Sequence, residues 1–205
     1  IYDLAKIKRV IVSTYQAVSG AGKEGIDELD AQVRDHSEGR EMTANILPSA
    51  SAEKHYPIAF NLIPQIDVFC DNLYTKEEMK MVNETKKIME DYEMRITATT
   101  IRVPVYRSHS ESVNIELEKE VDLGAMREAL AKFPGVTVQD DPSKQEYPMP
   151  LYTSEKDDVY VGRLRRDESC EKSYNIWVVG DQIRKGAALN TLQIAETMIK
   201  NCLLY

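Results

Sequence analysis

The chain has 205 residues, of which 42% are hydrophobic, and a formal net charge of -8. This length and composition suit one large globular domain, and the acidic balance argues against nucleic acid or an anionic membrane surface as a partner. No apolar run approaches the ~20 residues that a membrane span needs. The three cysteines are widely spaced, which argues against a disulfide framework or a bound metal ion and is typical of a cytoplasmic protein.

The first expected elements are a β-branched strand over residues 8–14 and a helix over residues 23–37. In the helix, Ile26, Leu29 and Val33 follow one another at spacings of three and four residues. Apolar residues at these spacings lie on one side of a helix, so they predict its buried stripe.

A glycine-rich turn with Gly20, Gly22 and Gly25 matches the dinucleotide-binding pattern G-x-G-x-x-G. That pattern belongs to a larger unit, in which a second strand ends in an acidic residue about 20 residues further on. A long irregular stretch over residues 40–57 stands there instead. A complete dinucleotide-binding fold is therefore not predicted, and we favour a smaller contact between this helix N-terminus and a phosphate or an amide of a cofactor.

Capping residues and alternating patterns place the remaining elements. Thr75 and Glu78 form a capping box that opens a helix over residues 76–90, and Asp122 caps a helix that ends at Pro134. Strands are expected over residues 95–106, 112–118, 136–138, 158–165 and 173–179, and a largely apolar helix over residues 185–203. These elements predict an α+β domain, with a mixed, largely antiparallel sheet of about six strands and helices on one face.

Four polar residues are candidates for a binding site. Glu77 and Lys80 share one helix face, where they either hold opposite ends of a charged substrate or form an exposed ion pair. Arg102 lies in an apolar strand and needs a carboxylate or phosphate partner, and His109 lies among hydroxyl residues that suit either a titrating imidazole or a surface histidine. In one straight strand Arg102 and His109 would be about 23 Å apart on opposite faces. They share a site only if the chain bends at Pro104.

Several segments, in this order, resemble the aspartate-semialdehyde dehydrogenases. They are VSTYQAVSGAG (12–22), PIAFN (57–61), EEMK (77–80), RVPV and RSHSES (102–112), YVGR (160–163) and KGAALNT (185–191). The resemblance implies the C-terminal catalytic and dimerisation domain of a bacterial member, lacking the N-terminal Rossmann domain and the nucleophilic cysteine. Residues 1–184 would form this domain, and residues 185–205 a helix that packs on the absent NADP-binding domain.

The resemblance also implies a reaction. The family reduces L-aspartyl 4-phosphate to L-aspartate 4-semialdehyde with NADPH, through a cysteine thioester, on the route to lysine, methionine and threonine. The site that binds NADP would lie mostly in the missing domain, and the chain alone is expected to be inactive. Cys70, Cys170 and Cys202 lack the sequence context of the family's nucleophile.

The resemblance assigns a role to each matching residue. His109 would be the general acid/base, Gln16 would orient the acyl group, Arg102 would clamp the substrate carboxylate and Glu77 would bind its ammonium group. Lys80 would contact the phosphate, and the cofactor would touch Ser19, Gly20 and Gln182.

A homodimer or homotetramer is expected, and Ile176, Trp177 and Val179 are candidates for a subunit interface on the uncovered sheet face. Two other functions remain open. An N-acetyl-γ-glutamyl-phosphate reductase would share the chemistry, but its acetylated substrate has no ammonium group for Glu77 to meet. A non-catalytic dimerisation module is the second, although the set of polar site residues is complete apart from the pieces expected upstream.

Overall fold

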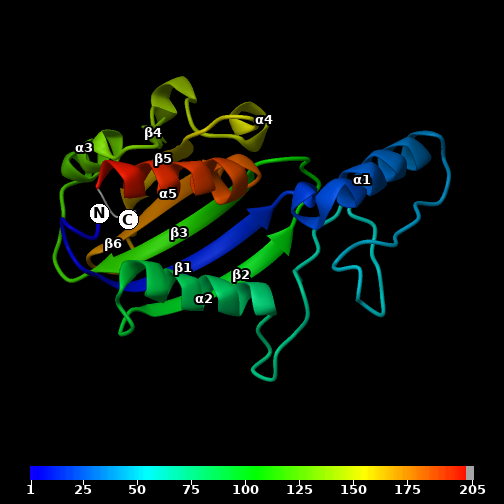
Figure 1. The fold of residues 1–205 in the computed structure, drawn as a ribbon, viewed down its shortest axis with the longest axis horizontal. Helices are drawn as coiled ribbons and strands as arrows, with labels where there is room; N and C mark the ends of the chain where they lie inside the picture. Colours follow the sequence, from blue (N-terminus) through cyan, green and yellow to red (C-terminus); the bar gives the residue numbers. More distant parts are fainter. Residues whose placement is uncertain (202–205) are drawn as a thin grey trace.

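Six strands form one mixed sheet in the computed structural model, which describes residues 1–201 (Figure 1). The strands, in sheet order, are β2 (Arg95–Arg102), β1 (Ile7–Gln16), β3 (His109–Leu117), β6 (Ser173–Gly180), β5 (Val159–Arg166) and β4 (Val136–Val138). The pairs β1–β2 and β4–β5 are parallel and the other three pairs are antiparallel. The predicted mixed, largely antiparallel sheet is therefore confirmed.

Helices α2 (Lys76–Met89), α3 (Leu123–Lys132) and α5 (Leu189–Lys200) lie over the same side of this sheet, which we call the helix face (Figure 1). The main core forms where α3 packs on it. Met126 and Leu117 there have no exposed surface, and the hydroxyl of buried Tyr174 both accepts from Val121 N and donates to Val121 O. The short helix α4 (Pro150–Thr153) was not predicted.

Helix α1 (Gly22–Ser37) projects beyond the end of the sheet, as Figure 1 shows. Its predicted buried stripe is wrong at Val33, which is 39% exposed. The buried positions include Glu28 and Gln32, because these side chains bind the backbone of the long loop that follows. Gln32 accepts from Ile58 N and Ala59 N at 2.8 and 3.0 Å and donates to a carbonyl oxygen at 2.9 Å.

The strand predicted over residues 95–106 is shorter than expected, because it ends at Arg102. β2 ends at Arg102, and the chain then turns through Pro104 and through Ser108, whose φ of 73° lies in the left-handed region. β3 begins at His109, three residues before the predicted start at Ser112. The required bend therefore exists.

The side of the sheet opposite the helices, which we call the open face, carries Tyr15 and Trp177, whose ring centroids are 5.7 Å apart. Two of the three residues predicted for an interface are not available there. Ile176 points to the helix face and is 7% exposed, and Val179 has no exposed surface. Trp177 remains partly exposed, so it alone of the three can contribute to an interface.

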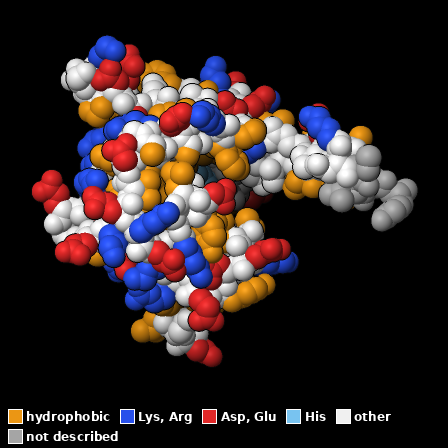
Figure 2. Space-filling model, turned by 90° about the vertical axis from the view of Figure 1, so that its left-hand side faces the viewer, with side chains coloured by type: hydrophobic (Ala, Val, Ile, Leu, Met, Phe, Trp, Pro, Cys, Tyr) orange, Lys and Arg blue, Asp and Glu red, His pale blue; other side chains and the backbone are white. Residues whose placement is uncertain are grey.

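The C-terminal helix differs in detail from the prediction over residues 185–203. A wide turn over Arg184–Ala188 precedes α5, which ends at Lys200, and residues 202–205, including Cys202, lie outside the described residues. In Figure 2 the end of this helix, next to the grey residues, stands away from the body of the molecule. No residue of α5 is buried. None of the helices within residues 1–201 is long and apolar enough to cross a membrane.

Candidate active site

The predicted site residues come together at one end of the helix face. Gln16 and Arg102 are register partners at the ends of the parallel strands β1 and β2. His109 begins β3, which runs antiparallel to β1, so its first residue lies at the same end of the sheet. Strand pairing therefore joins residues that are far apart in the sequence.

The peptide groups of Ala17 link Arg102 to His109. Ala17 N donates to His109 Nδ1 at 3.1 Å, and Ala17 O accepts from Arg102 Nη1 at 2.7 Å. Because Nδ1 is an acceptor, the proton of the neutral imidazole lies on Nε2. Burial, and then the positive charge of Arg102, lower the pKa of His109 to about 3, although Asp181 opposes this shift.

Arg102 is the buried cation of the site, with 4% of its surface exposed. Its Nε is buried and has no hydrogen-bond partner. Burial lowers the pKa of Arg102 to about 10, and Glu77 opposes this shift. A guanidinium with free donors matches a carboxylate or phosphate in a bidentate pair, so this side chain has the properties of an anion clamp.

Glu77 lies opposite Arg102, in the first turn of α2. Thr75 and Glu78 form the predicted capping box there, and Glu78 also accepts from Thr100 N at 3.0 Å, which ties the helix to β2. Gln16 Nε2 donates to Glu77 Oε1 at 3.3 Å. Lys80 Nζ lies 3.6 Å from Glu77 Oε2 and its side chain is 57% exposed. Lys80 thus shares a helix face with Glu77, as predicted, and forms an ion pair with it.

The three predicted cofactor residues differ in how accessible they are. Gly20 is exposed, and a Cβ there would lie 2.6 Å from Arg102 Nη1, so a larger residue would displace the guanidinium. Ser19 is 8% exposed, and its hydroxyl accepts from Gln182 Nε2 at 2.5 Å. Gln182 is half-buried and lines the cavity beside His109. Gly20 and Gln182 are thus accessible and Ser19 is not, and the three residues fit one edge of a dinucleotide rather than a whole binding site.

Two acidic residues near His109 were missed at the level of sequence. Glu111 follows His109 on the same side of β3, and the two line a cavity of about 220 Å³ together with Lys185. Burial raises the pKa of Glu111. Asp181 has no exposed surface and pairs with Arg107 at 2.8 Å. The alternation in β3 could have indicated the side on which Glu111 lies, whereas no local pattern indicates that Asp181 is buried.

We expect His109 to stay neutral from pH 5 to 8. The folded-state pKa is lowered below the unfolded value, so the unfolded chain binds the proton first, and this residue's contribution to stability is lost as the pH falls below about 6.5. Nitrogen-15 NMR of the imidazoles should show His109 with its proton on Nε2 throughout. A His109 ring that carries protons on both nitrogens within this pH range contradicts the expectation.

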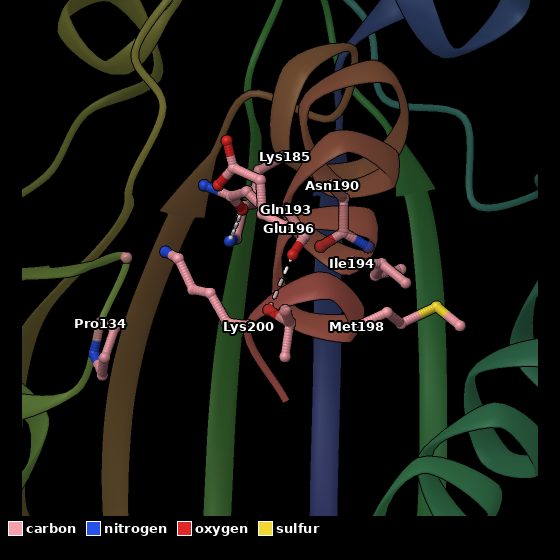
Figure 3. A pocket seen from close by; sticks show the side chains of 10 residues that line it. Pro134, Lys185, Asn190, Gln193, Ile194, Glu196, Met198 and Lys200 are labelled. Atoms are coloured by element: carbon pink, nitrogen blue, oxygen red, sulfur yellow. Dashed lines mark hydrogen bonds between the residues drawn. The ribbon is translucent and has the colours of Figure 1, made fainter. Parts of the chain in front are cut away.

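Another cavity, of about 480 Å³, lies elsewhere. Figure 3 shows it between α5 and the turn at Pro134, with Lys185 and Lys200 on the side of that turn and Ile194 and Met198 turned away. Its lining is mainly polar, and Lys185 Nζ donates to Gln193 Oε1 there at 2.6 Å. It contains none of the predicted site residues. The free Cys70 and Cys170 line neither this cavity nor the one beside His109.

The model of one protein family, semialdehyde dehydrogenase, dimerisation domain, matches residues 1–185. The chain belongs to this family. This dimerisation domain is 50% identical over 204 residues to an aspartate-semialdehyde dehydrogenase of Aquifex aeolicus, and it covers 58% of that protein. The crystal structure of aspartate semialdehyde dehydrogenase II from Vibrio cholerae superposes with a TM-score of 0.90 at 42% identity, over 97% of this chain and 57% of that one. A second structure of that enzyme is complexed with ASA. The domain thus spans a little over half the length of these proteins.

Proposed function

We propose that this domain forms the substrate-binding half of an aspartate-semialdehyde dehydrogenase. The observation that carries the proposal is the placement of Arg102, Gln16 and Glu77, because a buried cation with free donors lies across from a carboxylate. An α-amino acid presents the complementary pair, a carboxylate for Arg102 and an ammonium group for Glu77. The two similar proteins named above carry the same activity in their names.

In the proposed reaction, a thiolate from outside residues 1–201 attacks the acyl carbon of L-aspartyl 4-phosphate. The bond from this carbon to the phosphate oxygen breaks, phosphate leaves and a thioester remains. NADPH then supplies the hydride for reduction, after which the thiolate leaves and the aldehyde is released. A reducing compartment keeps a catalytic thiol in its active form, so we place the reaction in the cytoplasm.

The described residues would bind and orient the reactants. His109 presents Nε2–H as a proton donor, and Gln16 has an amide with which to orient the acyl group. Lys80 is exposed enough to reach a phosphate. The cofactor's edge is proposed to lie at Ser19, Gly20 and Gln182, with most of its binding site in a nucleotide-binding domain.

Two further surfaces have proposed partners. The open face, centred on Tyr15 and Trp177, would meet the same face of a second copy across a two-fold axis. The complete assembly would be a homodimer or a homotetramer. Residues 185–205 would pack on the nucleotide-binding domain. This second assignment is supported by Leu192, Ile194 and Ile199 of α5, which are 63%, 54% and 64% exposed.

The test is the activity of the intact parent enzyme with aspartate 4-semialdehyde, phosphate and NADP, followed as NADPH absorbance. We expect His109→Ala to lower kcat/KM by about a hundredfold or more, as for the loss of a general acid/base. The matched control, His36→Ala on the exposed face of α1, should retain full activity. Loss of activity in both variants would point to misfolding rather than to chemistry.

N-acetylglutamate semialdehyde distinguishes the alternative substrate. Glu77→Gln should weaken the reaction of the aspartyl substrate, whose ammonium group then loses its charged partner, and leave any reaction of the acetylated one unchanged. A parent enzyme that prefers the acetylated substrate overturns the substrate assignment. A parent that lacks both activities favours a non-catalytic dimerisation module.

A further inference from the structure

The segment after β6 is fixed by a buried carboxylate. Asp181 accepts from Glu155 N at 2.7 Å and from Ile183 N at 2.9 Å, and it pairs with Arg107 Nη2 at 2.8 Å. A fully buried carboxylate with these partners holds the backbone around it in one position. The next residue, Gln182, is therefore presented in a defined direction.

The side-chain amide of Gln182 bridges two segments that are distant in the sequence. Its Oε1 accepts from Ser108 N at 3.1 Å, and its Nε2 donates to Ser19 Oγ at 2.5 Å. Both serines are buried, at 1% and 8% exposure. Ser108 has the strained φ of 73°, and its hydroxyl lies 2.7 Å from Thr153 Oγ1. Each polar end of the Gln182 amide thus makes a hydrogen bond within this chain.

These two segments are the ones that hold His109. Ser108 directly precedes it, and the turn that contains Ser19 supplies the Ala17 amide that donates to Nδ1. The same turn brings Gly20 against the imidazole, since a Cβ there would lie 3.5 Å from His109 Cε1. One side chain therefore joins the backbone that leads into His109 to the backbone that orients its ring.

We infer that Gln182 is a positioning residue that sets the orientation of the His109 imidazole. This inference rests on the proposed function, because orientation matters only if His109 acts on the substrate. It goes beyond the assignment of Gln182 to the cofactor, because it gives the amide a second role, to hold Ser108 and Ser19 in place. A displaced imidazole lowers the rate of the chemical step rather than the affinity for either ligand.

In the intact enzyme, Gln182→Met keeps the length of the side chain and removes both hydrogen bonds. We expect kcat to fall by about tenfold to a hundredfold, with the KM values for NADP and for the semialdehyde changed by less than about twofold. Gln182→Glu can still accept from Ser108 N and from the Ser19 hydroxyl, so it should recover most of the rate. Ser19→Ala, which breaks one of the two bonds, should have an intermediate effect and serves as the second variant if Gln182→Met does not fold.

A KM for NADP that rises tenfold at unchanged kcat would show a cofactor contact and overturn the inference, as would a kcat unaffected by all three variants. Nitrogen-15 NMR of His109 in the present chain gives a readout that does not depend on activity. We expect the single Nε2–H form to become a mixture of tautomers in Gln182→Met. If the parent is inactive but this spectral change occurs, the proposed reaction fails while the positioning role is supported.

Discussion

Replacing Arg102 with methionine will raise the KM of the intact enzyme for aspartate 4-semialdehyde by about thirtyfold or more. The loss follows from removing one partner of a desolvated charge pair, which costs about 2 to 5 kcal/mol of binding. The fold is expected to lose no more than about 1 to 3 kcal/mol, because Ala17 O loses the bond from Arg102 Nη1, while removal of the buried, unpartnered Nε offsets part of that loss. Binding is followed by steady-state kinetics and stability by guanidinium titration of this chain.

Two variants sharpen this test. Arg102→Lys keeps the charge but not the planar fork, so it should recover only part of the affinity. Arg95→Met, at the opposite end of β2, removes an arginine whose side chain is 63% exposed and should leave the KM unchanged. A wild-type KM in Arg102→Met would remove the main support for the proposed substrate site.

The substitution Gln32→Leu will lower the free energy of unfolding of this chain by about 3 kcal/mol. It leaves the amides of Ile58 and Ala59 and the carbonyl of Thr43 without their partner, and each unsatisfied buried group costs about 1 to 3 kcal/mol, part of which the apolar side chain offsets. For a chain of this size the midpoint of thermal unfolding should fall by about 6 to 12 °C.

The neighbouring variant Val33→Ala is the matched control. It tests whether the side of α1 with Gln32 or the side with Val33 contributes more to the free energy of unfolding. Val33 is 39% exposed, so its truncation should change the free energy of unfolding by less than about 0.5 kcal/mol. If Val33→Ala is the more destabilising of the two, the buried stripe is the one predicted from apolar spacing and the contacts of Gln32 contribute little. Both measurements need only this chain and a denaturant titration.

The contrast between Gln32 and Val33 shows which structural features local sequence patterns can predict and which they cannot. The capping box at Thr75 and Glu78 and the alternation in β3 are local, and the structure confirms both. The burial of Gln32 depends on backbone groups 26 and 27 residues away, which no spacing within α1 reveals. Polar residues become buried where a loop needs partners for its backbone, so apolar periodicity mispredicts that helix face.

The candidate active site, like the fold, was predictable only in its local features. Residue chemistry indicated that Arg102 needs an anion, and Pro104 indicated the bend that places it near His109. The bond from Ala17 N to His109 Nδ1 could not be predicted, because every residue has an amide and only the pairing of β1 with its neighbours directs this one. The role of Gln182 was hidden for the same reason, since its partners lie 74 and 163 residues away.

The order of the strands has a consequence for how the chain folds. β1 is the second strand of the sheet, yet its two neighbours are β2 and β3, which begin at Arg95 and His109. A ribosome therefore releases β1 long before either neighbour exists, and both of its edges offer unpaired backbone groups in the meantime. Closing loops of this length before any pairing is gained slows folding. The nascent chain should be most prone to aggregate until residues up to Leu117 have emerged.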